Sequence, residues 1–236
     1  MELRPFRAIR FSPAIIARDG LENLIVPVPA GAGFAPAAGE QALKESLAAG
    51  RLWKERRPGM WQQSQTLGTT EAPVVVRMLV GLVRVDPPGD VELPTPEPAP
   101  EARDLRLVRL RELKADFEPA LILTRAPLTA ALATTRRPDH SVTDGNGVRH
   151  DLLRITDYAE HVELQGLVKN AEASLVTGAD DWEAAREFAK DAVAAKMPGA
   201  RYKLSAIVEE SAVGGLGRLP RLYAGFFGFS VEDPVY

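Results

Sequence analysis

The sequence contains no cysteine among its 236 residues. This absence excludes disulfide bonds, thiolate catalysis, zinc–thiolate sites and iron–sulfur clusters. Histidine is also scarce, with three residues at His140, His150 and His161. No two of them have the i, i+4 helical spacing of a metal-binding H-E-x-x-H motif, so the sequence predicts no metal site.

The chain also lacks a long hydrophobic run and a large excess of charge. Its longest apolar stretch, Val74–Val85, contains Arg77 and Arg84 and is too short to cross a bilayer. The opening residues, MELRPFRAIRF, have no apolar core of a signal peptide. The formal net charge of −3 gives no overall field that would attract nucleic acid or an anionic membrane. We therefore expect a soluble, cytoplasmic protein that binds neither.

The predicted strands and helices intermingle along the chain. This order predicts a mixed α/β (α+β) fold, in which helices flank a mixed β-sheet, and we expect one domain over residues 1–236. Apolar residues make up 45% of the chain, which is enough for a sizeable core. Strands are expected at 3–11, 23–28, 60–66, 74–85, 105–110, 119–124, 148–155, 173–176, 202–208 and 221–229, and helices at 41–49, 128–134, 157–170 and 180–196.

The segment 86–103 is rich in proline and acid, with six prolines and five acidic residues against one arginine. Proline has no backbone N–H to donate, so this segment cannot lie in the interior of a sheet. It is either an interdomain linker or a long loop. We favour a loop, because Leu105–Leu110 (LRLVRL) resumes a strand-like alternation that could pair back against Val74–Val85.

Several local patterns predict turns or caps. The TDGNG sequence at 143–147 is typical of a hairpin turn, because Asp-Gly and Asn-Gly tolerate positive φ angles. Asp180 with Glu183 three residues later forms a capping-box pattern at the start of a helix. The stretches Gly31–Gly33 and Gly214–Gly217 lack the spacing of a phosphate-binding loop, so we interpret both as turns.

A basic cluster surrounds Trp53. Arg51, Lys54, Arg56 and Arg57 have the composition of a nucleic-acid patch. Because the whole chain is slightly acidic, we interpret the cluster as the solvated end of a helix.

Five segments together resemble the domain of unknown function 1015 family of bacterial and archaeal proteins. The opening RPFRAIRF and the hairpin DGNGVRHDLLRITD at Asp144–Asp157 are the specific parts. VGLVRVD, FEPALILT and RYKLSAIV follow the same order, beginning at Val80, Phe117 and Arg201. The resemblance implies a mixed α/β fold with a signature A-D-G-H-H-R that follows a strand and opens a helix. That signature is similar to those of ParB/sulfiredoxin-like domains, some of which are nucleotide-dependent phosphoryl-transfer enzymes.

The signature is absent at its expected position in this chain. Residues Thr177–Trp182 read T-G-A-D-D-W, so Asp180 and Asp181 replace the two histidines and Trp182 replaces the arginine. A helix N-terminus with histidine and arginine side chains can hold polyphosphate, whereas two carboxylates repel it, by about 1–4 kcal/mol for charges ~4 Å apart. An upstream His-Glu stretch expected from the family is also missing, and Glu112, Lys114 and Asp116 are its only possible remnants.

Three interpretations of function follow. The preferred one is a non-catalytic relative that has lost the phosphoryl-transfer site. The second is a small-molecule phosphotransferase or another Mg²⁺-dependent enzyme with a rearranged acidic site. The third is a protein that self-associates as a homo-oligomer through aromatic residues near 223–229. The second interpretation makes Asp180, Asp181 and His150 the candidate catalytic residues, Arg149, Arg154 and Gly178 the candidate ligand-binding residues, and leaves the cofactor open.

Overall fold

The computed structural model of the chain describes residues 1–12, 14–16, 36–68, 73–86, 91–93, 100–143, 147–191, 194–214, 216, 219–220 and 228–236. The expected strand at 23–28 and the turn at 31–33 lie outside these residues, as does most of the expected strand at 221–229. None of the described helices is long and apolar enough to span a bilayer.

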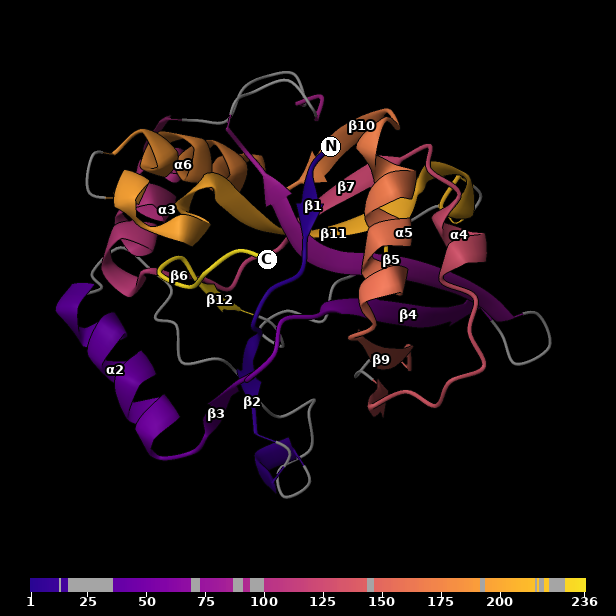
Figure 1. Cartoon of the computed structure of the whole chain (residues 1–236), viewed down its shortest axis with the longest axis horizontal. Coiled ribbons are helices and arrows are strands. Elements are labelled where there is room, and N and C mark those ends of the chain that lie inside the picture. The colour runs from indigo at the N-terminus through magenta and orange to yellow at the C-terminus, as the bar shows by residue number, and fades with distance from the viewer. Residues whose placement is uncertain are drawn as a thin grey trace.

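A mixed β-sheet forms the centre of the fold (Figure 1). It contains β1 (Leu3–Arg4), β4 (Met60–Gly68), β5 (Pro73–Arg84), β7 (Ala120–Thr124), β8 (His140–Thr143), β9 (Arg149–Ile155), β10 (Ala173–Thr177) and β11 (Tyr202–Glu209). The strand order is β10-β7-β11-β5-β4-β9-β8, and β1 pairs with the end of β5 beyond β4. The pair β11–β7 is parallel and the other pairs are antiparallel, so the fold is mixed α/β as the sequence predicts.

Strand β5 lies at the middle of this sheet. Its β-branched residues favour an extended backbone, and the side chains from Met78 to Val83 are buried on both faces of the sheet. Neighbouring strands β4 and β11 bury further apolar residues, including Met60, Trp61 and Ile207. The main hydrophobic core therefore surrounds β5.

Helices cover the sheet in two groups. They are α2 (Pro36–Ala48), α3 (Pro100–Leu113), α4 (Leu128–Ala131), α5 (Tyr158–Lys169) and α6 (Ala179–Lys190). Helices α3 and α6 pack against each other, whereas α5 crosses in front of the sheet beside α4 (Figure 1). The Asp157 side chain caps α5 by accepting a hydrogen bond from Glu160 N at 3.0 Å, at the helix start that the sequence predicts.

Two small antiparallel sheets flank the main one. Strand β2 (Ile9–Phe11) pairs with β3 (Leu52–Lys54), and β6 (Ala115–Asp116) pairs with β12 (Phe229–Ser230). A second, smaller hydrophobic cluster lies here and includes Phe11 and Phe117.

The expected strand at Leu105–Leu110 is wrong, because this segment lies within α3. Leu107, Leu110 and Leu113 are buried with a spacing of three residues, whereas Leu105 and Val108 are exposed. The alternating sequence LRLVRL is compatible with the two-residue period of a strand and with the 3.6-residue period of a helix. Packing against α6 stabilises the helix. Residues 100–103 of the proline-rich segment consequently belong to α3, and Pro100 occupies the first position of this helix, where its missing N–H costs no helical hydrogen bond.

Three other predictions differ from the structure. The expected strand at 3–11 is divided by Pro5 into β1 and β2, which belong to different sheets. The basic cluster at 51–57 is not a helix end, because Leu52–Lys54 forms β3. Helix α6 ends at Lys190, and a short 3₁₀ turn at Ala194–Lys196 follows it.

A buried ion pair joins the main sheet to β6. Lys203, the second residue of β11, donates to both carboxylate oxygens of Asp116, at 2.9 and 2.8 Å, and both residues are almost fully buried. Asp116 also accepts hydrogen bonds from Glu118 N and Leu204 N, each at 3.1 Å. The charges are thus paired and the carboxylate oxygens are saturated, as burial of an ion pair requires.

We expect Lys203→Met to lower the free energy of unfolding by about 3–5 kcal/mol, because it leaves a buried carboxylate without a cation. Adding Asp116→Asn should cost less than the sum of the two single substitutions, since the neutral amide leaves no unpaired charge and its oxygen can still accept one of the two backbone hydrogen bonds. Urea denaturation measures both effects. The control Lys190→Met removes an exposed ion pair with Glu187 and should cost less than about 1 kcal/mol. Similar losses at positions 203 and 190 would contradict the prediction.

Candidate functional site at the start of helix α6

The segment at which the resemblance predicts the signature joins β10 to α6. Gly178 is the N-cap residue, with a left-handed φ of 83°, and its carbonyl accepts the first helical hydrogen bond from Trp182 N at 2.8 Å. The predicted capping role of Asp180 is therefore wrong. Asp180 and Asp181 lie instead in the first turn of the helix, where the positive end of the helix dipole stabilises a negative charge.

Gly178 is required here for two physical reasons. A left-handed backbone costs an L-residue roughly 1–2 kcal/mol. In addition, a Cβ atom at this position would lie 3.1 Å from the Cα atom of Ala120 on β7. The candidate ligand-binding residue thus has a clear structural role, namely to let the chain turn tightly against the sheet.

Trp182 points into the protein interior. Only 3% of its surface is exposed, and Ala185 and Phe188 continue the same buried face of α6. The side chain that stands in place of the signature arginine is therefore part of the hydrophobic core.

Asp181 instead meets Glu118 and Arg106, which come from other elements. Glu118 forms an ion pair with Arg106 on α3 at 2.6 Å and a second, short ion pair with Arg109 on the same helix. Arg106 also lies 3.4 Å from Asp181, so it links α3 to both carboxyl groups. Lys203 donates to the Glu118 carbonyl oxygen, which connects this cluster to the buried ion pair.

The two carboxyl groups of this cluster titrate differently. The pKa of Asp181 is raised to about 7, mainly by burial and also by a hydrogen bond with the Glu118 carboxylate, against the opposing effect of Lys203. Burial also acts to raise the pKa of Glu118, but the hydrogen bond from Asp181 and the nearby charges of Arg106 and Arg109 outweigh it and lower that pKa. The pair therefore holds one proton, carried by Asp181, over much of the acidic and neutral range.

Little open space remains beside this cluster. The cavity lined by Arg106, Glu118, Asp181 and Lys203 has a volume of about 20 Å³. That volume admits about one water molecule, whereas pockets for small-molecule ligands measure roughly 300–1,000 Å³.

Asp180 does not join Asp181 in a carboxylate pair for Mg²⁺. Consecutive residues on a helix point about 100° apart, so the two side chains leave α6 in different directions. Among the described residues, no group of three or more histidine, aspartate or glutamate side chains is arranged to hold a metal ion.

The candidates on β9 lie far from the start of α6. Four strands separate β10 from β9 in the sheet, which corresponds to about 24 Å at the usual strand spacing. The structure therefore does not bring Arg149, His150 and Arg154 near Asp180 and Asp181.

Each of the β9 candidates has local partners. Arg149 forms an exposed ion pair with Asp151 at 3.0 Å, and Arg154 pairs with buried Glu55 at 3.1 Å. His150 is 2% exposed, and its Nδ1 atom lies 3.3 and 3.2 Å from the amide nitrogens of two buried residues of β4, Gln63 and Gln65. Burial among these amides fits a structural role for His150.

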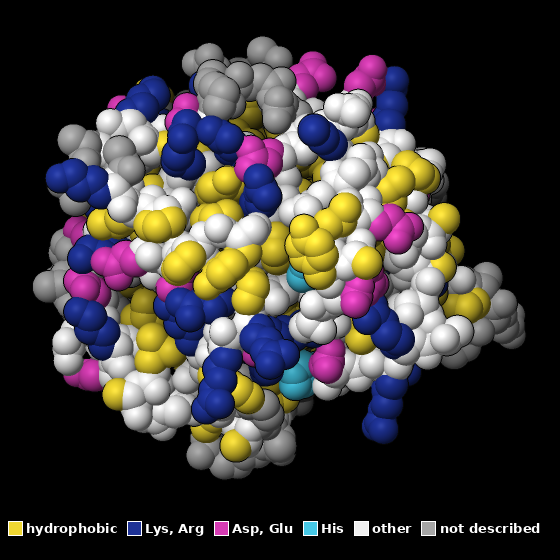
Figure 2. Space-filling view, viewed as in Figure 1, with side chains coloured by type: hydrophobic (Ala, Val, Ile, Leu, Met, Phe, Trp, Pro, Cys, Tyr) yellow, Lys and Arg dark blue, Asp and Glu magenta, His cyan; other side chains and the backbone are white. Residues whose placement is uncertain are grey.

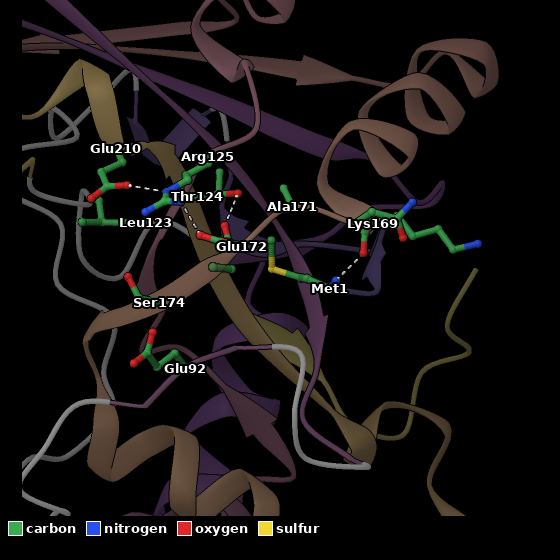
Figure 3. Close-up of a pocket in the computed structure, with 12 residues that line it drawn as sticks. Met1, Glu92, Leu123, Thr124, Arg125, Lys169, Ala171, Glu172, Ser174 and Glu210 are labelled. Carbon is green, nitrogen blue, oxygen red and sulfur yellow. Dashed lines mark hydrogen bonds and ion pairs between the residues drawn. The ribbon is translucent and has the colours of Figure 1, made fainter.

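A larger, open cavity of about 680 Å³ lies near the C-terminal end of α5 (Figure 3). Arg125 bridges Glu172 at 2.6 Å and Glu210 at 3.6 Å across it, and all three side chains are well exposed. Glu92 and Ser174 lie at another part of its wall, and the Met1 amine donates to Lys169 O at 2.7 Å. None of the residues predicted from the sequence lines this cavity, and its arginine is already paired with acids.

The acid–arginine cluster is only weakly indicated by the sequence. Asp116 was a suggested remnant of the family motif, but Glu118, Arg106, Arg109 and Lys203 were not candidates. The useful signal is a lysine within the otherwise apolar strand Lys203–Val208, because a buried lysine needs an acidic partner.

We expect Gly178→Ala to lower the free energy of unfolding by about 2–3 kcal/mol, through backbone strain and contact with β7. Two glycines with open space around them separate these effects by urea denaturation. Gly147→Ala, with a φ of 77°, should cost about 1–2 kcal/mol from strain alone, and Gly166→Ala within α5 should gain about 0.5–1 kcal/mol. A loss at Gly178 no larger than at Gly147 would argue against the contact with Ala120.

We expect Asp181→Asn to stabilise the protein at pH 8 by about 2–4 kcal/mol more than at pH 4. The folded pKa of about 7 exceeds the ordinary value of 3.8, so the folded state binds a proton between these values that the unfolded state has lost. The contribution of Asp181 to stability is therefore complete below pH 3.8 and declines as the pH rises to 7. Chemical denaturation across this range measures it. Asp180→Asn controls for loss of an acid from the same helical turn, and a constant difference between wild type and Asp181→Asn would contradict the prediction.

The comparisons with known proteins give one result. A family model described as "Protein of unknown function (DUF1015)" matches residues 31–214. No curated protein and no solved structure matches the chain.

Proposed function

Because the chain belongs to the DUF1015 family of proteins of unknown function, we propose that it is a non-catalytic member, with a degenerate site, that acts by binding another molecule. The observation that carries this proposal is the packing at the start of α6. Trp182 is buried there, and the neighbouring cavity of about 20 Å³ has no room for a nucleotide.

Charge at this position supports the same proposal. Around the cavity, three acids pair with three cations. The acids are Asp116, Glu118 and Asp181, and the cations are Arg106, Arg109 and Lys203. Each of these cations is thus already paired with a carboxyl group of the chain itself. A triphosphate would have to displace these carboxylates, at the cost of leaving buried charges unpaired.

A specific observation favours the enzyme interpretation as a second candidate. A carboxyl group with a pKa of about 7 is suited to general acid–base catalysis, and Asp181 shares a proton with Glu118. This candidate requires the acid–arginine cluster to open, because Asp181 is only 17% exposed.

Self-association through aromatic residues near 223–229 is a third candidate. Phe229 cannot contribute to an exposed aromatic interface, because it is 2% exposed and packs edge-to-face on Phe6 with ring centroids 6.5 Å apart. The aromatic residues at 223–227 lie outside the described residues.

We expect Mg²⁺–ATP and Mg²⁺–ADP to leave the melting temperature unchanged. A nucleotide with a Kd of about 10 μM, added at about 1 mM, would stabilise the protein by about 2.7 kcal/mol and raise the Tm by roughly 5–10 °C. Differential scanning fluorimetry detects a shift of this size. A rise in Tm that disappears in Asp181→Ala would reject the non-catalytic proposal and favour the enzyme.

A further inference from the structure

A basic surface with an exposed tryptophan lies over β2 and β3. Trp53 is 40% exposed in the middle of β3, and the exposed residues Arg51, Arg56 and Arg57 flank it in sequence. Figure 2 shows lysine and arginine side chains gathered in the lower central part of the view, over these two strands. We call this the Trp53 surface.

The structure holds Trp53 firmly in place. The guanidinium carbon of Arg10 lies 5.2 Å from the Trp53 ring centre and 5.6 Å from that of buried Trp61, so it stacks between two aromatic rings. Glu55 fixes Arg10 with an ion pair of 2.8 Å, and both of these side chains are buried. A rigid aromatic side chain loses little entropy on binding, which is typical of interface hot spots.

Cations outnumber acids on and beneath this surface. Glu55 is shared by Arg10 and Arg154, and Asp233 is shared by Arg7 and Lys54, at 2.9 and 2.5 Å. The Asp139 carboxylate accepts a hydrogen bond from Arg154 N at 2.6 Å. Among the described residues, no acid lies within ion-pair distance of Arg51, Arg56 or Arg57. Counted over the described residues, seven cations therefore meet three acids, an excess of four positive charges on a chain whose net charge is −3.

We propose that the Trp53 surface binds an acidic polypeptide segment that carries a proline or an aliphatic residue among its aspartates and glutamates. Carboxylates match the flat, forked donors of Arg56 and Arg57, and an apolar side chain can cover the exposed face of Trp53. Tryptophan and arginine are also the residue types that contribute most to protein–protein binding.

A nucleic acid fits this surface less well. The carboxylates of Glu55, Asp139 and Asp233 lie among the cations and would repel a continuous row of phosphates. The acidic chain as a whole also provides no long-range attraction for a large polyanion. The interaction is independent of the proposal for α6, since peptide binding at β3 neither requires nor excludes nucleotide binding elsewhere.

Fluorescence anisotropy with a labelled acidic peptide tests the inference directly. The probe is a fluorescein-labelled peptide of about twelve residues, with a central Pro-Leu pair flanked by glutamates. We expect saturable binding that weakens at least tenfold in Arg56→Glu/Arg57→Glu and about tenfold in Trp53→Ala. Raising NaCl from about 50 to about 500 mM should also weaken it, because salt screens exposed charges. The same peptide with glutamine in place of glutamate should not bind.

A matched control keeps the test specific. Arg103→Glu/Lys190→Glu makes the same change in net charge on α3 and α6 and should leave peptide binding unchanged. Trp53→Phe keeps an aromatic ring over Arg10 and should retain most of the affinity, so a folding defect in Trp53→Ala is distinguished from loss of contact. Equal binding by wild type and by Arg56→Glu/Arg57→Glu would overturn the inference. Tighter binding of a single-stranded oligonucleotide of the same charge would also overturn it, in favour of a nucleic-acid surface.

Discussion

The buried ion pair between Lys203 and Asp116 is the constraint on which the polar part of this structure depends. Lys203 is the second residue of β11, a central strand of the sheet, and its charge cannot be left without a partner in the core. Asp116 satisfies it and also accepts the backbone N–H group of Glu118. The turn that follows β6 is thereby fixed, and this turn holds the Glu118 carboxylate against the arginines of α3 and against Asp181 of α6. One buried charge thus determines where four elements meet.

The same constraint explains why the start of α6 is closed. In the related signature, histidine and arginine side chains would occupy the first turn of this helix. Here the first-turn acid Asp181 turns toward cations contributed by α3 and β11, so the positive charge comes from other elements and is neutralised within the protein. Buried Trp182 fills the remaining position. A network that satisfies its own charges gains stability and specificity of packing, but it leaves no donor free for a phosphate.

The sequence predicted the parts of the fold that local patterns determine. The strand at 74–85, the helix that starts near Asp157 and the helix that starts near Asp180 each follow from residues close together in the chain. The strand expected at Leu105–Leu110 was wrong because its alternation is compatible with two periods, and only contact with α6 selects one. Asp180 was a reasonable cap by composition, but the backbone needs a left-handed residue against Ala120, and that need arises from the sheet.

The acid–arginine cluster could not be predicted for a related reason. Arg106, Glu118, Asp181 and Lys203 are spread over almost a hundred residues, and nothing in their spacing indicates that they meet. What the sequence did contain was a local difference from the signature that the resemblance implies, with aspartates where histidines are expected. Such a difference concerns the residues of one segment, whereas charge compensation is a property of all the elements that pack there. The Trp53 surface differs, because most of its cations lie close together in the sequence. The position of Trp53 and the balance of charge there nevertheless depend on Arg10, Glu55 and Asp233, which only the fold places beneath it. At the start of α6, residues from distant parts of the chain pair with the local charges. At the Trp53 surface, such residues leave an excess of positive charge, so we expect binding there.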